Sequence, residues 1–201
     1  MHDYAIFGHS RTTIGRWLGV ASITLSGGAS SLFAWAQTAS GWTVFAGASL
    51  TAAFIYFVLH LLFDKYAWKL PFFKIPDLNG VWEVRGETLE EDGKVRFPWT
   101  AQIDIEQTWE KIAICLKTSQ SSSESYTATI SKKAGTNGGW VLHYSYANTP
   151  EAGQYHELNA HKGYCEVIID KALTSGEANY FNSNGRRTFG KMYLTREGLN
   201  D

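Results

Sequence analysis

The longest feature of the hydropathy pattern is a run without charge near the N-terminus. No Asp, Glu, Lys or Arg lies between Arg16 and Asp64, although charged residues make up 18% of the 201-residue chain. Within this run, residues 17–36 and 42–63 are each about 20 residues long, enough at about 1.5 Å per residue to cross a hydrocarbon layer of about 30 Å. The pattern therefore predicts two transmembrane helices.

The segment between the two predicted spans, residues 37–41, is too short for anything other than a tight turn. The two helices are therefore expected to be antiparallel neighbours. Basic residues flank the spans on their outer sides: Arg11, Arg16, Lys65, Lys69 and Lys74. Because the turn has no charge, the positive-inside tendency predicts that both ends of the chain lie in the cytoplasm.

Two other interpretations of this run remain open. One is a buried helical hairpin in a soluble core, although such helices normally keep a polar face. The other is a signal peptide, because the two arginines, the apolar run and Ala34-Trp35-Ala36 match the basic start, the apolar core and the small-residue cleavage site of such peptides. The apolar run is long for that role, and cleavage would leave the orientation of the second span unchanged.

Beyond a connector that contains Pro71 and Pro76, the period of the hydropathy pattern changes to two. Ala101, Ile103 and Ile105, for example, alternate with polar residues, as in a half-buried antiparallel strand. Turn signals separate such runs, and Asn184-Gly185 is a strong one, so the pattern predicts about eight strands. They are expected to begin near Gly80, Phe97, Lys111, Ser125, Trp140, His161, Ala178 and Thr188.

The predicted strands form an all-β domain, residues 76–201, which follows an N-terminal membrane segment, residues 1–75. Short connections imply an up-and-down antiparallel meander, and closure into a barrel removes its exposed edges. Gly80-Val81-Trp82 opens the first strand, and Arg196 shares one face of the last strand with Met192 and Leu194. This resembles lipocalin-type barrels, in which such a Trp fills the floor and such an Arg covers the indole. Gly80, Trp82 and Arg196 would then be structural.

Charge and motifs exclude several classes of function. The net charge of −1 gives no basic footprint for polymeric DNA or RNA. There is no nucleophile elbow, P-loop or dinucleotide-binding fingerprint, so we expect no catalytic residue, no cofactor and no enzyme. His156, His161 and Cys165 are not spaced like metal ligands, and no metal site is expected. Cys165 and Cys115 are expected to be reduced, small apolar strand residues.

The arrangement of two spans and a compact barrel resembles a bacterial family of anti-phage effectors, the two-transmembrane β-barrel effectors of CBASS (cyclic-oligonucleotide-based anti-phage signalling). The resemblance covers nearly the whole chain. It rests on the charge-free hairpin, on the junction Ile75-Pro76-Asp77-Leu78-Asn79-Gly80-Val81-Trp82, and on the C-terminal residues Asn179-Tyr180-Phe181-Asn182, Arg187 and Gly190-Lys191-Met192-Tyr193-Leu194.

This resemblance implies a receptor in the bacterial inner membrane. The barrel would bind a cyclic di- or trinucleotide made by a partner nucleotidyltransferase, with no stable complex between the two proteins. Subunits would then form a homo-oligomer, the membrane segment would breach the lipid bilayer, and the cell would die before the phage spreads. Small residues spaced mostly four apart on the first span, including Gly15, Gly19 and Ser22, would permit close packing between copies.

A cyclic nucleotide requires aromatic faces for its bases and Arg or Lys donors for its phosphates. By strand parity, five aromatic residues are expected to face the barrel interior: Trp99, Tyr126, Trp140, Tyr144 and Tyr180. Core packing is the alternative role for each, and also for Trp109. Arg186 and Arg187, with Asn182 and Asn184, are expected to bind phosphate at the barrel mouth, and solvated turn charges are the alternative role for the two arginines. Arg85 is expected on the outer face.

Two further functions stay open at this point. A membrane-tethered, lipocalin-like module for an apolar small molecule would have an interior of aliphatic and aromatic side chains only. A structural membrane partner would have a filled barrel without a cavity. A pocket with both stacking rings and arginine would favour the effector.

Overall fold

The computed structural model describes residues 1–40, 52–135, 138–154, 159–183 and 186–198. The chain forms two compact units. One contains Met1–Gly8 and Lys74–Asp201, and the other contains His9–Phe73. The first eight residues therefore group with the strands, whereas the sequence pattern had assigned residues 1–75 to the membrane segment.

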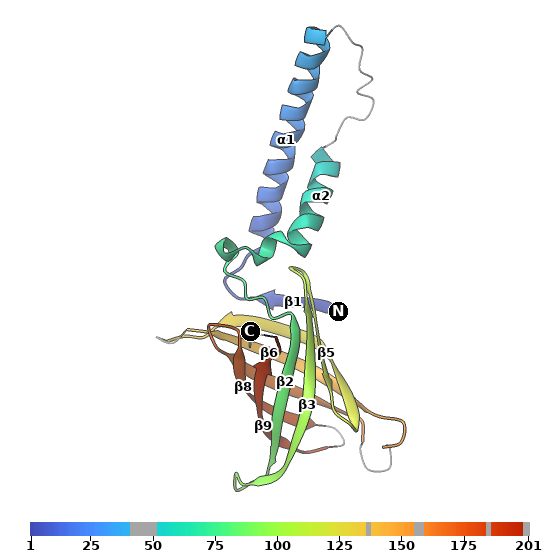
Figure 1. Cartoon of the computed structure of the whole chain (residues 1–201), viewed down its shortest axis with the longest axis vertical. Coiled ribbons are helices and arrows are strands. Elements are labelled where there is room, and N and C mark those ends of the chain that lie inside the picture. The colour runs from blue at the N-terminus through green and yellow to red at the C-terminus, as the bar shows by residue number, and fades with distance from the viewer. Residues whose placement is uncertain (41–51, 136–137, 155–158, 184–185, 199–201) are drawn as a thin grey trace. The chain divides into compact units, whose positions relative to one another are not determined.

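The helical unit consists of α1 (Arg11–Ser40), α2 (Ala52–Lys65) and two short 3-10 turns, Ala67–Lys69 and Pro71–Phe73 (Figure 1). The turn predicted at residues 37–41 is wrong for residues 37–40, which form the end of α1. No glycine or proline interrupts the helix there, and the Thr38 hydroxyl donates to the Trp35 carbonyl at 2.8 Å. Gly41 and the start of the predicted second span lie outside the described residues.

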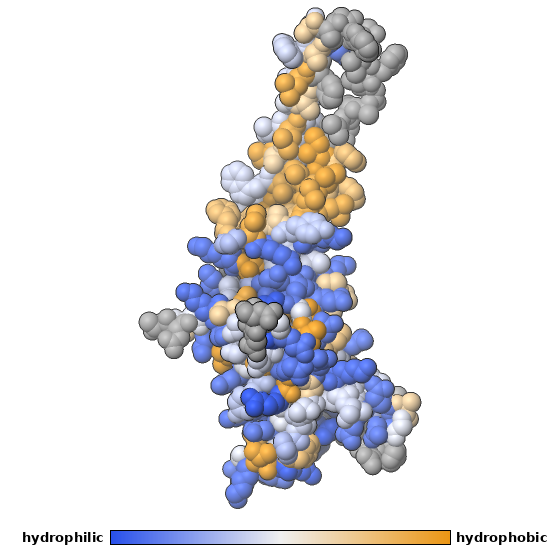
Figure 2. Space-filling model, in the orientation of Figure 1, coloured by the Kyte–Doolittle hydropathy of each residue, from blue (hydrophilic) through white to orange (hydrophobic). Residues whose placement is uncertain are grey.

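On the face shown in Figure 2, apolar side chains cover much of the helical unit, whereas the barrel is mostly hydrophilic. On α1, Trp17, Ile23 and Trp35 are each at least two-thirds exposed. Among the described residues, one helix, Arg11–Ala39, is long and apolar enough to span a membrane. A helix without a buried apolar face is unfavourable in water, and it is suited to lipid.

In the part of the chain that the structure describes, nine strands close into a barrel in the order β1-β4-β3-β2-β9-β8-β7-β6-β5. The predicted all-β barrel is confirmed, and the predicted strand starts lie close to those of β2 to β9. The strands are β1 (His2–Ile6), β2 (Gly80–Leu89), β3 (Val95–Gln107), β4 (Lys111–Lys117), β5 (Ser121–Lys132), β6 (Trp140–Pro150), β7 (His161–Ile169), β8 (Ser175–Ser183) and β9 (Phe189–Arg196).

The ninth strand, β1, was not predicted. It pairs antiparallel with β4, through His2 and Ile112, and parallel with β5, from Tyr4 opposite Ala128 to Ile6 opposite Ile130. Tyr4 and Ile6 are buried in the barrel. Because its partners lie more than a hundred residues away along the chain, no local turn signal marks this strand.

Alternation along the strands fills one end of the barrel with apolar side chains. The Trp82 indole donates to the Leu78 carbonyl at 3.1 Å, and the Arg196 guanidinium carbon lies 5.5 Å from the Trp82 ring centroid. Arg196 also donates to the Asn79 carbonyl. These contacts close the floor of the barrel. The guanidinium group covers the indole ring, and the two carbonyl groups accept the hydrogen bonds that Trp82 and Arg196 donate.

The same alternation separates the two cysteines. On β4, Ile112 and Ile114 point inward, so Cys115 has the opposite parity and is exposed on the outer face. Cys165 is buried, and burial raises the pKa of its thiol to about 12. Both cysteines are free strand residues as expected, and only Cys165 contributes to the core.

Gln107, at the end of β3, joins β1 to the segment that enters β2. Its amide nitrogen donates to the Tyr4 hydroxyl at 2.9 Å and to the Pro76 carbonyl at 3.1 Å, and its oxygen accepts from the Leu78 amide at 2.9 Å. Gln107 is only 5% exposed, so water does not reach these groups easily. One side chain thus satisfies three buried polar groups.

We expect Gln107→Leu to lower the free energy of unfolding by about 2–4 kcal/mol, because it leaves buried donors and acceptors without partners. Thermal unfolding of the full chain in detergent, followed by tryptophan fluorescence, measures the loss. Gln102→Leu is the matched control, since Gln102 is exposed on the same strand and should cost about 1 kcal/mol or less. Equal losses in both variants would contradict the role of the buried network.

Candidate ligand-binding cavity

A cavity of about 430 Å³ occupies the barrel end opposite the floor. Trp82 at the floor and Thr88 at the cavity both point inward from β2, six residues apart, which corresponds to about 20 Å at about 3.3 Å per residue. A cavity of this volume lies within the range of about 300–1,000 Å³ that is typical of small-molecule sites. The barrel is therefore packed at one end and hollow at the other.

Three aromatic side chains of the cavity lie directly across the sheet from a glycine. The pairs are Trp99 with Gly86, Tyr146 with Gly163, and Tyr180 with Gly190. A Cβ atom at any of these glycines would overlap the facing aromatic side chain. Each ring therefore occupies the space that a side chain at the facing glycine would fill. The absence of that side chain lets the ring pack against the barrel wall.

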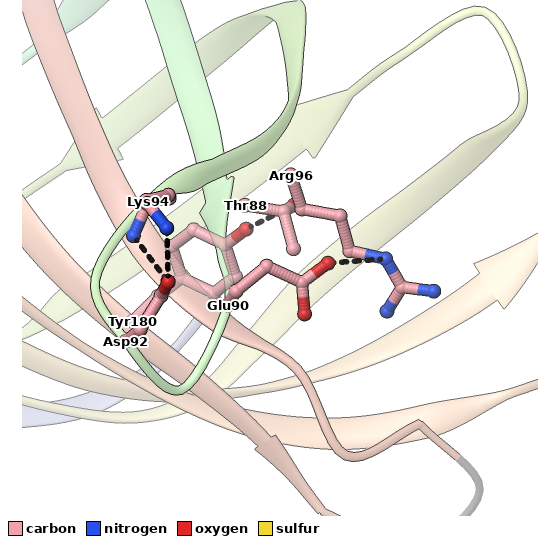
Figure 3. Close-up of polar contacts among 6 residues, drawn as sticks. All are labelled: Thr88, Glu90, Asp92, Lys94, Arg96 and Tyr180. Carbon is pink, nitrogen blue, oxygen red and sulfur yellow. Dashed lines mark hydrogen bonds and ion pairs between the residues drawn. The ribbon is translucent and has the colours of Figure 1, made fainter.

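Polar contacts fix two of these rings. The Tyr180 hydroxyl lies 2.9 Å from the Thr88 hydroxyl (Figure 3). The Tyr180 ring meets the Trp99 ring edge-on at a centroid distance of 5.8 Å. The Tyr146 hydroxyl donates to the Asn182 side-chain oxygen at 2.7 Å. Because their hydroxyl groups are bound, these tyrosines stand in fixed positions.

The β2–β3 hairpin carries two ion pairs. Glu90 contacts Arg96 at 3.4 Å, and Asp92 contacts Lys94 at 2.7 Å (Figure 3). All four side chains are more than half exposed, so these ion pairs contribute little stability. None of the four lines the cavity, and the charge of the cavity comes from another residue.

Arg186 brings a positive charge to the cavity wall. Its charge opposes the rise of the Tyr146 pKa that burial causes, and it helps to lower the pKa of His161. No Asp or Glu occurs among the described residues that line the cavity. The cavity therefore favours an anion.

Seven serine and threonine side chains also line the cavity. They are Thr88, Thr100, Thr118, Ser119, Ser121, Ser123 and Thr188. Hydroxyl groups can donate to the oxygen atoms of an anion or accept from an amine, and they are uncharged in both roles. Together with the rings and Arg186, they give a site that is aromatic, hydroxyl-rich and cationic.

Five of the residues expected to bind ligand line this cavity: Trp99, Tyr144, Tyr180, Asn182 and Arg186. Burial raises the pKa of Tyr144 well above its ordinary value, so its hydroxyl stays neutral. Asn184 lies outside the described residues. Arg187 is exposed and does not line the cavity. Trp109 is buried away from it, and Arg85 is exposed as expected.

Tyr126 does not face the interior, contrary to the prediction from parity. The ladder between β5 and β6 shifts between Ser125 and Thr127, so Tyr126 lies at a β-bulge. Before the bulge Ser123 points inward, and after it Ala128 does. The extra residue reverses the alternation, and Tyr126 is left 47% exposed.

Trp140 lies at the wrong end of its strand to reach the cavity. It pairs with Ile169 at the floor end of β6, whereas the cavity is lined by Tyr144 and residues after it. Its half-buried ring lies 5.7 Å from the Lys132 ammonium group. Parity alone did not reveal how far along the barrel the ring would lie.

The cavity also contains residues that sequence reasoning missed as ligand-binding candidates: Tyr146, Asn148, His161, Thr88 and Thr188. Tyr146 shares its parity with Tyr144, and that signal was available in the sequence. The spacing of His161 excludes a metal site and gives no sign of a ligand contact. His156, from the same group of residues, lies outside the described residues.

The fold and the cavity define a class, the small-ligand-binding β-barrels, here carried by a chain with an apolar helical unit. Residues 73–196 match the family model of the Cap15 cyclic dinucleotide receptor domain, and residues 12–69 match that of the Cap15 TM helices. The chain is 36% identical to CD-NTase-associated protein 15 of Yersinia aleksiciae over 212 residues, which cover 97% of each chain. The chain belongs to the Cap15 family.

Membership of this family confirms the resemblance drawn from the sequence. The helical unit is the family's transmembrane region, and the chain is accordingly a membrane protein. Strands β2 to β9 lie within the residues that match the receptor domain. Strand β1 belongs to the same barrel but precedes the matched residues.

Proposed function

We propose that this protein is a membrane effector of CBASS whose barrel cavity binds a cyclic dinucleotide. A partner nucleotidyltransferase makes the nucleotide during infection, and binding drives assembly of copies that breach the inner membrane. The observation that carries the proposal is the cavity itself, in which aromatic rings, hydroxyl groups and Arg186 surround about 430 Å³. The protein acts by binding rather than by catalysis.

The chemistry of the cavity matches that of the ligand. A cyclic dinucleotide has two flat bases and two phosphates, and it therefore requires π-faces and donors for anionic oxygens. Trp99 and Tyr180 supply faces, while Arg186 and the hydroxyl groups supply donors. A module for an apolar ligand would not need Arg186, and a filled barrel would have no cavity.

In this proposal the ligand acts by stabilising the assembled state. A ligand shifts an equilibrium only by the difference between its affinities for the two states, so the oligomer must bind the nucleotide more tightly than the free subunit does. The apolar surface of α1 stays in the bilayer, and both termini lie in the cytoplasm. The small residues of α1 allow close packing between copies.

Arg186 and Arg187 provide a matched test of this function. We expect Arg186→Ala to weaken binding of the best cyclic dinucleotide by about 10–100-fold, because it removes a charge-assisted hydrogen bond from a partly buried site. Arg187→Ala removes the same charge from an exposed neighbour and should change the affinity by about twofold or less. Calorimetry on the full chain in lipid nanodiscs, with a panel of cyclic di- and trinucleotides, measures both.

Dye release from liposomes tests the membrane step with the same variants. The full chain should release dye only when its best nucleotide is present, and Arg186→Ala should require correspondingly more nucleotide. No binding across the panel would refute the receptor function. Equal release with and without nucleotide would refute the trigger while leaving the binding step in place.

A further inference from the structure

Asn148, near the end of β6, has a buried acceptor without a partner. The residue is 7% exposed and lines the cavity. Its side-chain nitrogen donates to the Ser121 hydroxyl at 3.1 Å. Its side-chain oxygen has no hydrogen-bond partner among the described residues. A buried acceptor of this kind favours a ligand that brings a donor.

His161 provides a second acceptor directly opposite. It pairs with Asn148 across the β6–β7 ladder, is 8% exposed and lines the same cavity. Its Nδ1 atom lies 2.9 Å from the Asn159 carbonyl oxygen. Since a carbonyl oxygen cannot donate, Nδ1 carries a hydrogen, and in the neutral ring Nε2 then has a free lone pair.

The neutral state of this ring follows from its surroundings. Burial lowers the pKa of His161, the hydrogen bond to Asn159 raises it, and the charge of Arg186 lowers it, with a net decrease. The ordinary value for histidine is about 6.5, so the ring is neutral at about pH 7. His161 then accepts through Nε2.

The two acceptors lie close enough to bind one base. Residues directly opposite in an antiparallel ladder have Cβ atoms about 4.5–5.5 Å apart. Of the four bases, only guanine presents two adjacent donors on its Watson–Crick edge, N1–H and the N2 amine. Adenine and cytosine place an acceptor beside the amine, and uracil has one N–H between two carbonyl groups.

We propose that Asn148 accepts from the N2 amine of a guanine and His161 from its N1–H, so that this receptor selects a guanine-containing cyclic dinucleotide. The inference rests on the proposed function and specifies its ligand. A carboxylate would also accept from these two donors, but it would repel the phosphates of the same ligand. Two neutral acceptors beside Arg186 bind the base without that repulsion.

The test compares three ligands on the full chain in lipid nanodiscs: cyclic di-GMP, cyclic di-IMP and cyclic di-AMP. Inosine differs from guanosine only by lacking the N2 amine. We expect cyclic di-GMP to bind about tenfold more tightly than cyclic di-IMP, which is the effect of one hydrogen bond, and more tightly still than cyclic di-AMP.

Two variants assign this preference to Asn148. In Asn148→Ala the ratio of the cyclic di-IMP and cyclic di-GMP dissociation constants should fall to about one, whereas in Asn148→Asp, which keeps an acceptor, it should persist. Retained cyclic di-AMP binding shows that the alanine variant is folded. A wild-type ratio near one, or a ratio that survives Asn148→Ala, would overturn the assignment while the proposed function stands. Failure of all cyclic dinucleotides to bind would overturn both.

Discussion

Replacement of Gly163 by alanine is expected to reduce cyclic dinucleotide affinity by at least about tenfold. The new methyl group would overlap the Tyr146 ring and would lie 2.7 Å from the Asn182 side-chain oxygen. Tyr146 would have to leave its place, and its hydrogen bond to Asn182 would break. The wall of the cavity would thus change shape, and overpacking would cost about 1–3 kcal/mol of stability. Calorimetry and thermal unfolding of the full chain measure the two effects.

Gly153→Ala is the control for this substitution. Gly153 has a negative φ angle and nothing within 4 Å of the added methyl group, so the variant should bind and unfold like the parent. In a second test, Tyr146→Leu in the Gly163→Ala background should recover stability but not affinity, since it relieves the overlap without restoring the ring. Unchanged affinity in Gly163→Ala would show that Tyr146 does not shape the site.

The pairs of glycine and aromatic residue show which features of the site could not be predicted from the sequence. Alternation alone assigned Trp99, Tyr144 and Tyr180 to the interior, and they line the cavity. The register between strands is not visible in any one strand, however. That Gly163 lies opposite Tyr146, or that His161 lies opposite Asn148, follows only once the strands are paired.

The predictions for two aromatic residues, Tyr126 and Trp140, were wrong for different physical reasons. Tyr126 lies at a bulge, and a bulge inserts one residue without any change in hydropathy that would mark it. Trp140 has inward parity but lies at the floor end of β6, and parity carries no information about depth along the barrel axis. Parity therefore predicts which face a residue occupies, and register is needed to predict which site it joins.

The fold was predictable where contacts are local. The strands β2 to β9 follow one another through short connections, and alternation with turn signals located them. β1 is the exception, because it is five residues long, precedes a helix and pairs with β4 and β5 far along the chain. Pairing of that kind leaves no signature in a sequence window.

Deletion of Met1–Gly8 is expected to unfold the barrel at temperatures where the full chain is folded. The deletion removes Tyr4 and Ile6 from the core, and each buried side chain of this size contributes about 1.5–3 kcal/mol. It also exposes the Ile130 side chain and the strand edges that β1 covers. The total, about 3–6 kcal/mol, is a large part of the roughly 5–15 kcal/mol that stabilises a typical domain. Thermal unfolding in detergent measures the loss.

Substitutions on the two faces of β1 test whether its effect on stability comes from its buried side chains. Tyr4→Ser with Ile6→Ser should reproduce most of the loss, whereas Asp3→Asn with Ala5→Ser, on the exposed face of the strand, should change stability by about 0.5 kcal/mol or less. If the exposed-face pair were as damaging as the buried-face pair, burial of β1 would not be the source of its effect.

A peptide of residues 1–8 added to the truncated chain provides the sharpest form of the test. A strand that binds only the folded barrel stabilises it by RT ln(1 + [L]/Kd), so the melting temperature should rise with the concentration of the peptide. A peptide with serine in place of Tyr4 and Ile6 should have no effect. The peptide can bind in this way because β1 joins the barrel through pairing with β4 and β5 and through two buried side chains, and not through a turn. The barrel unit therefore includes a strand that precedes the helical unit in the sequence, and we expect a fragment that begins at Lys74 to be less stable than the full chain.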